Sequence, residues 1–562
     1  MILKNTCAVV AAATLLLLTG CRPADNHESK NREAFEQLLA GMSPQGERIT
    51  GGATDSMSAA GFERQRQEVS RQLDDLARID TSLLSPSERI DWRFAQSILH
   101  GKETELNRIR PWTRDPRLYM AFTGIRLVLD GPADPAKKMD EVNVRLNMAV
   151  VQLENGMRQL DTHVPRFREL GLFMAENGLG LFDRELPDFL ARHKADTMKA
   201  RVSAARQALA GFIRFLKEDL PGKPAGDFAI GPEAYNELLA RHYLLGYDAD
   251  SLYAFGKAHF DATVKELSEM ASRIKPGATR QEVAAAIKSE YPDPNRMIDV
   301  HQEWVNKSRD HVLKNKLIPI PWKEQVRVVE RAPYLRKTSY YGHFSFAREK
   351  DSTGTYTSEM HINPFEDQWD EKTKKEYLLE HDWGVILVTA PHETYAGHHI
   401  QGLYQANNPS SLRRDHSISI FSEGWGLYNE QLMRETGFFP NDKILFRQVQ
   451  LRLWRIARVV YDVGLHTGKM SYEDAVKLMT DGVGFLPWAA QLEIDAACAS
   501  PGYFIGYFTG MQEILALREE YRRLAGEKFS LSDFHEQLLK AGSMPIPLMR
   551  AHLLSSLKTT QP

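Results

Sequence analysis

The ten residues that begin at His392 constrain the fold of this chain more than any other segment, because they hold three histidines and a carboxylate directly after an apolar run. On an undistorted helix, His398 would lie about 240° around the axis and about 9 Å along it from His392. His399 would lie about 20° around but about 10.5 Å along. Neither pair could share one metal ion with bonds of about 2.0 to 2.1 Å. We therefore expect the helix to be interrupted by a short loop before Gly397, which would bring His398 back toward His392.

A second segment, Ser422–Glu430, places two acids in an apolar helical pattern. Imidazole nitrogens and carboxylate oxygens are the ligands that zinc prefers, and a catalytic zinc site with three protein ligands keeps one coordination position open. We predict that His392, His398 and Glu423 bind one zinc ion, with His399 as the alternative to His398. Residue types narrow the choice of metal only in part, so another divalent ion could fill the same site.

Two further acids have roles that follow from their positions. Glu393, next to the first ligand, would take a proton from the attacking water and return it to the leaving amine. Glu430 lies about two helical turns after Glu423 on nearly the same face, so it could orient a ligand histidine from behind. For both Glu423 and Glu430 the alternative is an ordinary acid on the solvent face of an amphipathic helix.

The N-terminus predicts export from the cytoplasm. A lysine, a short apolar run and Leu18-Thr19-Gly20-Cys21 resemble a bacterial lipoprotein signal, in which cleavage leaves Cys21 lipidated. An ordinary secretory signal is the alternative. Arg22 favours the outer membrane, facing the periplasm. We expect residues 1–20 to be the signal peptide and the polar residues 21–55 to be a lipidated tether.

Composition limits the class of partner. A net charge of −3, from 71 basic and 74 acidic residues, gives no electrostatic reason to expect nucleic acid. After the signal there is no apolar run of the roughly 18 residues that a spanning helix needs, so contact with the membrane should come from the lipid alone. Cys498 has no partner in the mature chain, which excludes a disulfide framework. Arg413 and Arg414 could bind a substrate carboxylate, although exposed arginines are common. The oligomeric state is left open.

The periodicity of apolar residues predicts a mainly α-helical, multi-helical chain. One helix should begin at Ser85, which precedes a proline and stands three residues before Glu88 in a capping pattern. Between Glu324 and Asn363, β-favouring residues and glycines predict a small antiparallel sheet beside the catalytic helix, whose edge could bind extended peptide. We divide the mature body into an N-terminal helical region, 56–320, and a catalytic region, 321–562.

The two motifs together resemble a known family. His-Glu, a variable pair, Gly-His-His and Gln, followed by Glu-Gly-Trp, are similar to the bacterial domain of unknown function 885, which lipoproteins often carry. That family is grouped with zincin-like metallopeptidases of the gluzincin type. The resemblance extends over most of the mature chain and implies a zincin-like fold.

Carried over to this chain, the resemblance assigns His392, His398 and Glu423 to the metal and Glu393 to the general base. It also makes Tyr507 a donor to the developing oxyanion, although Tyr503 and Tyr507, four residues apart, could instead be packing aromatics. The family usually has proline at the position of Ala396 and glutamine at that of Tyr503, and the second difference bears on substrate specificity.

These features predict a zinc-dependent hydrolase that cleaves amide bonds, most readily those of short peptides that can reach a covered cleft. One alternative is a metal-dependent amidase or carboxypeptidase that acts on a non-standard amide, such as a cell-wall fragment. Another is a lipoprotein that keeps the fold but binds peptide or a partner without turnover. The sequence has no Gly-x-Ser-x-Gly elbow, no phosphate-binding loop with lysine and no Cys-x-x-Cys pair. It does not indicate whether cleavage is terminal or internal.

Overall fold

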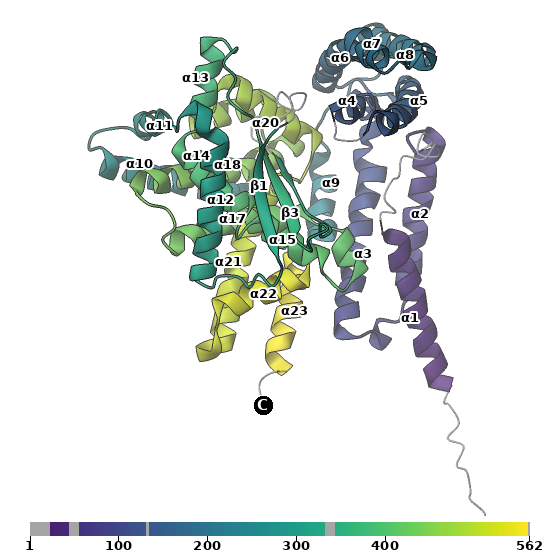
Figure 1. Ribbon diagram of the computed structural model, residues 1–562. Coiled ribbons are helices and arrows are strands. Elements are labelled where there is room, and N and C mark those ends of the chain that lie inside the picture. Colours follow the sequence, from purple (N-terminus) through teal and green to yellow (C-terminus); the bar gives the residue numbers. More distant parts are fainter. Residues whose placement is uncertain (1–22, 44–55, 131–133, 332–342, 560–562) are drawn as a thin grey trace, which may run out of the picture.

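The computed structural model describes residues 23–43, 56–130, 134–331 and 343–559 (Figure 1). The chain is mainly α-helical with one small sheet, as the sequence predicts. The expected signal peptide and the lipidation site Cys21 lie outside the described residues. Within the described ranges, no helix combines the length and the apolar character that crossing a membrane requires.

The first helix corrects the prediction of a tether. Residues 23–42 form α1 (Pro23–Met42), and its side chains Phe35, Leu38 and Met42 are buried against the body. These apolar residues recur at intervals of three and four, which gives the helix one buried face in an otherwise polar sequence. At least this part of the predicted tether is therefore an element of the folded protein.

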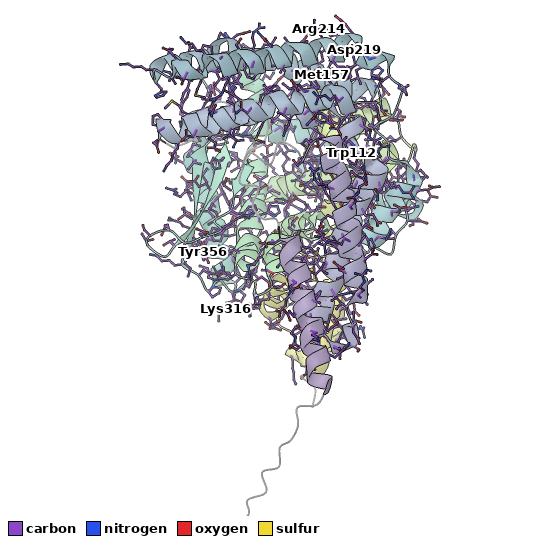
Figure 2. All side chains as sticks on the ribbon, turned by 90° about the vertical axis from the view of Figure 1, so that its right-hand side faces the viewer. Trp112, Met157, Arg214, Asp219, Lys316 and Tyr356 are labelled. Carbon is purple, nitrogen blue, oxygen red and sulfur yellow. The ribbon has the colours of Figure 1, made fainter. Side chains whose placement is uncertain are left out.

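Helices α4 to α8, together with the first half of α2, form a lobe with its own hydrophobic core, whereas α3 packs into the larger core. Between α2 and α3, the capping pattern at Ser85 is confirmed, because Ser85 Oγ accepts from the Glu88 amide over 3.3 Å and the Glu88 carboxylate accepts from the Ser85 amide over 2.7 Å. Helices α4 to α8 gather at one end of the molecule (Figure 1), where α5 and α8 run side by side (Figure 2). The bounds are α2 (Ala59–Arg78), α3 (Pro86–Thr104), α4 (Thr123–Asp130), α5 (Pro135–Gln159), α6 (Pro165–Gly180), α7 (Leu186–Arg192) and α8 (Lys199–Glu218).

A larger core unites the remaining helices. The helices that precede the sheet belong to it as well: α10 packs so closely on α18 that a Cβ atom at Gly256 would lie 3.0 Å from Val459. The predicted boundary at residue 320 therefore does not coincide with a division between cores. The helices are α9 (Gly231–Glu237), α10 (Ala249–Ile274), α11 (Arg280–Lys288), α12 (Met297–Lys314), α13 (Glu371–Glu380), α14 (Trp383–Glu393), α15 (His398–Ala406), α16 (Ser411–Asp415), α17 (Ser419–Glu435), α18 (Asp442–His466), α19 (Tyr472–Lys477), α20 (Pro487–Ala499), α21 (Gly506–Ala525), α22 (Leu531–Ala541) and α23 (Ile546–Thr559).

The sheet is mixed, whereas the sequence predicted an antiparallel one. Its order is β1 (Glu324–Glu330), β3 (Tyr356–Ile362), β2 (His343–Ser345). Strand β2 runs antiparallel to β3, as expected, but β1 runs parallel to β3. Strand composition does not encode direction, and the chain between β1 and β3 is long enough to return in the same sense.

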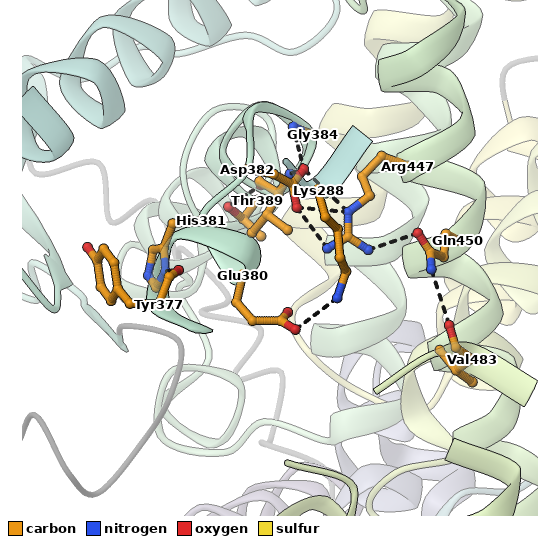
Figure 3. Close-up of polar contacts among 11 residues, drawn as sticks. Lys288, Tyr377, Glu380, His381, Asp382, Gly384, Thr389, Arg447, Gln450 and Val483 are labelled. Atoms are coloured by element: carbon orange, nitrogen blue, oxygen red, sulfur yellow. Dashed lines mark hydrogen bonds and ion pairs between the residues drawn. The ribbon is translucent and has the colours of Figure 1, made fainter. Parts of the chain in front are cut away.

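Two contacts fix the helices that carry the motifs. Helices α17 and α21 meet through glycines, because a Cβ atom at Gly424 would lie 2.6 Å from the carbonyl carbon of Gly510. The first turn of α14 is held by Asp382, whose carboxylate accepts from the amide of Gly384 over 2.8 Å and pairs with Arg447 of α18 at 2.9 Å (Figure 3). The first contact places α17 against α21 and the second ties α14 to α18, and α14 also packs on α17, so the segments around His392 and Glu423 lie together.

Candidate metal centre

The predicted interruption of the motif helix is confirmed. Helix α14 ends at Glu393 and α15 begins at His398. A Cβ atom at Gly397 would collide with the carbonyl oxygen of His392, so only glycine permits this close return of the chain. The loop is held from α17, where the indole Nε1 of Trp425 donates to the carbonyl of Ala396 over 3.0 Å.

The loop brings three of the predicted ligands together. His392, His398 and Glu423 each offer one ligand atom, and these atoms lie within 4.8 Å of one another. The imidazole centroids of His392 and His398 are 5.0 Å apart, and His398 Nε2 lies 3.5 Å from Glu423 Oε2. Tetrahedral bonds of about 2.1 Å would separate ligand atoms by about 3.4 Å, so the three side chains need only a small contraction around one cation. Two imidazoles and one carboxylate also form a donor set that suits zinc.

Hydrogen bonds orient the imidazole rings of His392 and His398 toward the position that a cation would occupy. Nδ1 of His392 lies 2.9 Å from Oε1 of Glu430, and Nδ1 of His398 lies 3.0 Å from Oε1 of Gln401. Because each Nδ1 faces an oxygen acceptor, the proton of a neutral ring would sit on Nδ1 and leave Nε2 to face a cation. Glu430, whose side chain is fully buried, thus makes the contact with His392 that the sequence suggested.

His399 does not join this group. Its Nε2 lies 2.9 Å from Glu324 Oε2 and its Nδ1 lies 3.0 Å from Ser358 Oγ, so both ring nitrogens are engaged with the sheet. The residue is 1 % exposed. Of the two candidate histidines, the structure places only His398 beside His392 and Glu423.

His398 and Glu423 form an ion pair. Burial lowers the pKa of the His398 imidazole, but its hydrogen bond with Glu423 and the charge of that carboxylate raise it to about 9. Burial likewise raises the pKa of the Glu423 carboxyl, and the contact with His398 lowers it to about 2. At neutral pH a cation would therefore have to displace a proton from His398, since ligands bind metals in their deprotonated form.

Two tyrosines stand beside Glu423. The Tyr503 hydroxyl donates to Glu423 Oε1 over 2.7 Å, a contact that sequence reasoning missed. Tyr507, half-buried, has its ring centroid 6.2 Å from that of Tyr503. Burial and the charge of Glu423 raise the pKa of the Tyr507 phenol, so it keeps its proton and can donate at neutral pH. The spacing of four residues was the available signal that both tyrosines face one site.

The cluster opens into a cavity of about 900 Å³, which Glu393 and Tyr507 also line. Among the lining residues, Phe346, Arg348, Asp415 and Tyr503 are exposed, whereas those of α18 are buried.

The two arginines suggested by sequence for a substrate carboxylate have other roles. Arg413 is buried and pairs with Asp91 at 2.6 Å. Arg414 lines the cavity but donates to the carbonyl of Asn408 over 2.6 Å. The suggestion is wrong for Arg413, whose charge is already neutralised.

Comparison with known proteins adds the family and the fold. The model of the family described as "Bacterial protein of unknown function (DUF885)" matches residues 39–553. The structure is similar to that of a candidate lipoprotein of unknown function from Shewanella oneidensis, with a TM-score of 0.75, 20% identity and coverage of 94% of this chain and 98% of the other. It is also similar to a candidate lipoprotein from Colwellia psychrerythraea, with a TM-score of 0.74, 17% identity and coverage of 94% and 99%. At such identities the likeness shows the fold alone. No curated protein sequence matches the chain.

Proposed function

The chain belongs to the DUF885 family of bacterial proteins of unknown function, and we propose that it is a zinc-dependent hydrolase of amide bonds in short peptides. One observation carries the proposal: the ligand atoms of His392, His398 and Glu423 converge within 4.8 Å in a cavity that Glu393 also lines. The proposal includes a place among the zincin-like metallopeptidases of the gluzincin type.

The residues around the cluster suit this reaction. Bound there, zinc would polarise the scissile carbonyl and acidify a neighbouring water. The Glu393 carboxylate would accept the proton of the attacking water and pass it to the nitrogen of the leaving amine. The Tyr507 hydroxyl would donate to the carbonyl oxygen as negative charge develops on it. A cavity of about 900 Å³ has the size of a small-ligand site, which favours short peptides over folded proteins.

The proposed setting is the cell envelope. Two proteins with the same fold are described as candidate lipoproteins, which supports acylation of Cys21 in this chain. We place the protein in the outer membrane, facing the periplasm, because arginine follows Cys21.

Metal content tests the centre directly. Mass spectrometry of residues 22–562 should find about one zinc per chain, and His392→Ala, His398→Ala and Glu423→Ala should each lose it. No tightly bound metal, even after zinc is resupplied, would favour a lipoprotein that binds peptide or a partner without turnover.

Glu393→Gln separates metal binding from catalysis. This variant should keep its zinc, while hydrolysis of a pool of short peptides, followed by mass spectrometry, should fall by at least about a hundredfold. A variant that hydrolyses at the wild-type rate would remove Glu393 from the mechanism. Cleavage of cell-wall fragments but of no peptide would point to the amidase alternative.

A further inference from the structure

Two buried arginines of α18 line the cavity. Arg455 and Arg458 lie about one turn apart on α18 and are 5 % and 6 % exposed. Arginine is almost never buried to this degree unless its charge is paired. The partners of these two guanidinium groups therefore decide what they can do.

Arg458 has N–H groups that donate to no described residue. Its Nε donates to Glu493 Oε1 over 2.8 Å, and its guanidinium carbon lies 4.2 Å from the ring centroids of both Trp454 and Tyr507. No described residue accepts a hydrogen bond from its two terminal nitrogens. Since a guanidinium has five N–H donors in a planar fork, four remain available to a ligand in the cavity. The aromatic contacts hold that fork in place before any ligand arrives.

Arg455 adds a second positive charge. Its Nη1 donates to the carbonyl of Leu451 over 3.2 Å. Its nearest described carboxylate is Glu430, whose Oε1 lies 3.7 Å from Nη2, beyond hydrogen-bond distance. The charge of Arg455 is thus balanced only loosely by the protein.

Each arginine is linked to the metal cluster through a different ligand. Arg455 approaches Glu430, which holds His392. Arg458 stacks on Tyr507, whose neighbour Tyr503 donates to Glu423.

The cluster lies between exposed and buried parts of the cavity lining. The ring of Phe346, which is 47 % exposed, stands 6.4 Å from that of His398, whereas both arginines are buried. A substrate that reaches the cluster from solvent past Phe346 can therefore extend to the arginines inside the same cavity.

We propose that Arg458, assisted by Arg455, binds the C-terminal carboxylate of the substrate, so that hydrolysis removes residues from the C-terminus of a peptide. A planar guanidinium matches the two oxygens of a carboxylate, and such charge-assisted pairs are the strongest ordinary hydrogen bonds. Leu451 and Trp454, which line the cavity with the arginines, are 3 % and 7 % exposed, so a carboxylate bound there would be shielded from solvent. In a peptide without acidic side chains, the C-terminal carboxylate is the group that matches this fork. The inference rests on the proposed hydrolase function.

Binding tests the arginines without turnover. Calorimetry should compare N-acetyl-phenylalanine with its carboxamide on residues 22–562, both with zinc and without. Because a carboxylate can also ligate zinc, the metal-free protein removes that contribution, and the arginine variants separate the arginines from the other groups of the cavity. We expect it to bind the carboxylate at least about tenfold more tightly than the carboxamide. Equal binding of the two probes by the metal-free protein would overturn the inference.

The variants must avoid leaving a buried charge unpaired. Arg458→Met combined with Glu493→Gln removes both members of the pair, and Arg455→Lys, which keeps a positive charge beside Glu430 but loses the planar fork, is the second, independent variant. The double variant should lose most of the preference for the carboxylate, and Arg455→Lys should weaken it. Arg348→Met, at an exposed residue that lines the same cavity, is the matched control and should keep the full preference. Retention of the preference in the Arg458→Met, Glu493→Gln protein would also overturn the inference.

Kinetics separates this inference from the hydrolase proposal. The zinc-loaded enzyme should cleave a peptide with a free C-terminus at least about tenfold faster, in kcat/KM, than the same peptide with a C-terminal amide. Equal cleavage of both peptides would overturn the inference and leave the hydrolase intact. Failure to cleave any peptide, with an arginine-dependent preference in calorimetry, would instead overturn the hydrolase and support the carboxylate site.

Discussion

Gly426 lies against the imidazole of His392, so closely that a Cβ atom at position 426 would stand 2.7 Å from Cε1 and 2.8 Å from Nε2 of the ring. Residue 426 comes between Glu423 and Glu430 on α17. The same helix thus supplies a proposed ligand, the space for the His392 ring and the carboxylate that orients it. The position of His392 depends on α17 as much as on its own helix.

Gly426→Ala should therefore weaken metal binding without unfolding the protein. The added methyl group must displace the His392 ring, and disturbances of the groups around a ligand typically cost 10- to 100-fold in metal affinity. Alanine is also the better helix former, by about 1 kcal/mol, which limits any loss of stability. Zinc affinity can be measured by competition with a chelator. Gly211→Ala, where the new methyl group would meet open space, is the control. Equal zinc affinity in the two variants would show that the ring adjusts freely.

The adjacent histidines should give opposite results. His398→Ala should lose the metal, because its side chain belongs to the cluster. His399→Ala should keep the metal and lower the free energy of unfolding by about 1–3 kcal/mol, since it removes a hydrogen bond from the buried carboxylate of Glu324. Metal content and thermal unfolding of the two variants, measured side by side, check this. Loss of zinc in His399→Ala with full retention in His398→Ala would reverse the ligand assignment.

Tyr503 should contribute through its hydrogen bond to Glu423. Tyr503→Phe removes the donor that fixes the carboxylate, so zinc affinity should fall by about 10-fold or more. Tyr503→Gln should restore much of the affinity, because an amide N–H can donate to the same oxygen. Tyr507→Phe should leave zinc affinity unchanged while slowing turnover. If Tyr503→Phe and wild type bind zinc equally, the hydrogen bond is incidental.

The sequence predicts that His392, His398 and Glu423 lie together because the chemistry of a shared ligand set restricts their geometry. If His392 and His398 belong to one site, their spacing excludes a regular helix, and Gly397 is a residue at which the chain can turn back closely. Tyr503 and Arg458 were missed because their roles depend on packing between α17, α18 and α21, which no local pattern encodes. One signal was present: α18 carries four arginines, Arg447, Arg452, Arg455 and Arg458, among its apolar residues, and buried charges need partners.

Residues 23–42, expected to be part of a tether, form the packed helix α1, and this leads to a further prediction. A chain that begins at residue 56 should unfold at a lower temperature than one that begins at residue 22. The longer chain buries Phe35, Leu38 and Met42, each worth about 1.5–3 kcal/mol before the entropy of ordering the helix is subtracted. Asn31 also donates to the carbonyl of Asp80 over 3.0 Å. Equal thermal midpoints would return these residues to the role of a tether.

Three buried histidines should make the fold sensitive to acid. Burial lowers the pKa values of His301, His466 and His535 to about 4. In the unfolded chain their pKa values would be about 6.5. Between about pH 4 and 6.5 the unfolded state therefore binds protons that the folded state does not. Stability from these groups is thus full above pH 6.5 and is lost as the pH falls toward 4, by up to about 1.4 kcal/mol per pH unit for each histidine.

One buried acid should act in the opposite direction. Burial raises the pKa of Asp462 to about 7, against the hydrogen bonds it accepts from Gly502 and Tyr235. The folded state therefore holds this proton between about pH 4 and 7, and the contribution of Asp462 to stability falls as the pH rises through that range.

Two substitutions separate the opposing effects of the histidines and the acid. His535→Gln keeps a donor for the carbonyl of Leu317 and an acceptor for the hydroxyl of Tyr428, but it cannot titrate. Its thermal midpoint should fall less than that of wild type between pH 7 and pH 5. Asp462→Asn should fall more, because it loses the group that opposes acid unfolding. Identical pH profiles for all three proteins would mean that neither residue differs in pKa between the folded and unfolded chains, and a shallower profile for Asp462→Asn would reverse the sign assigned to its burial.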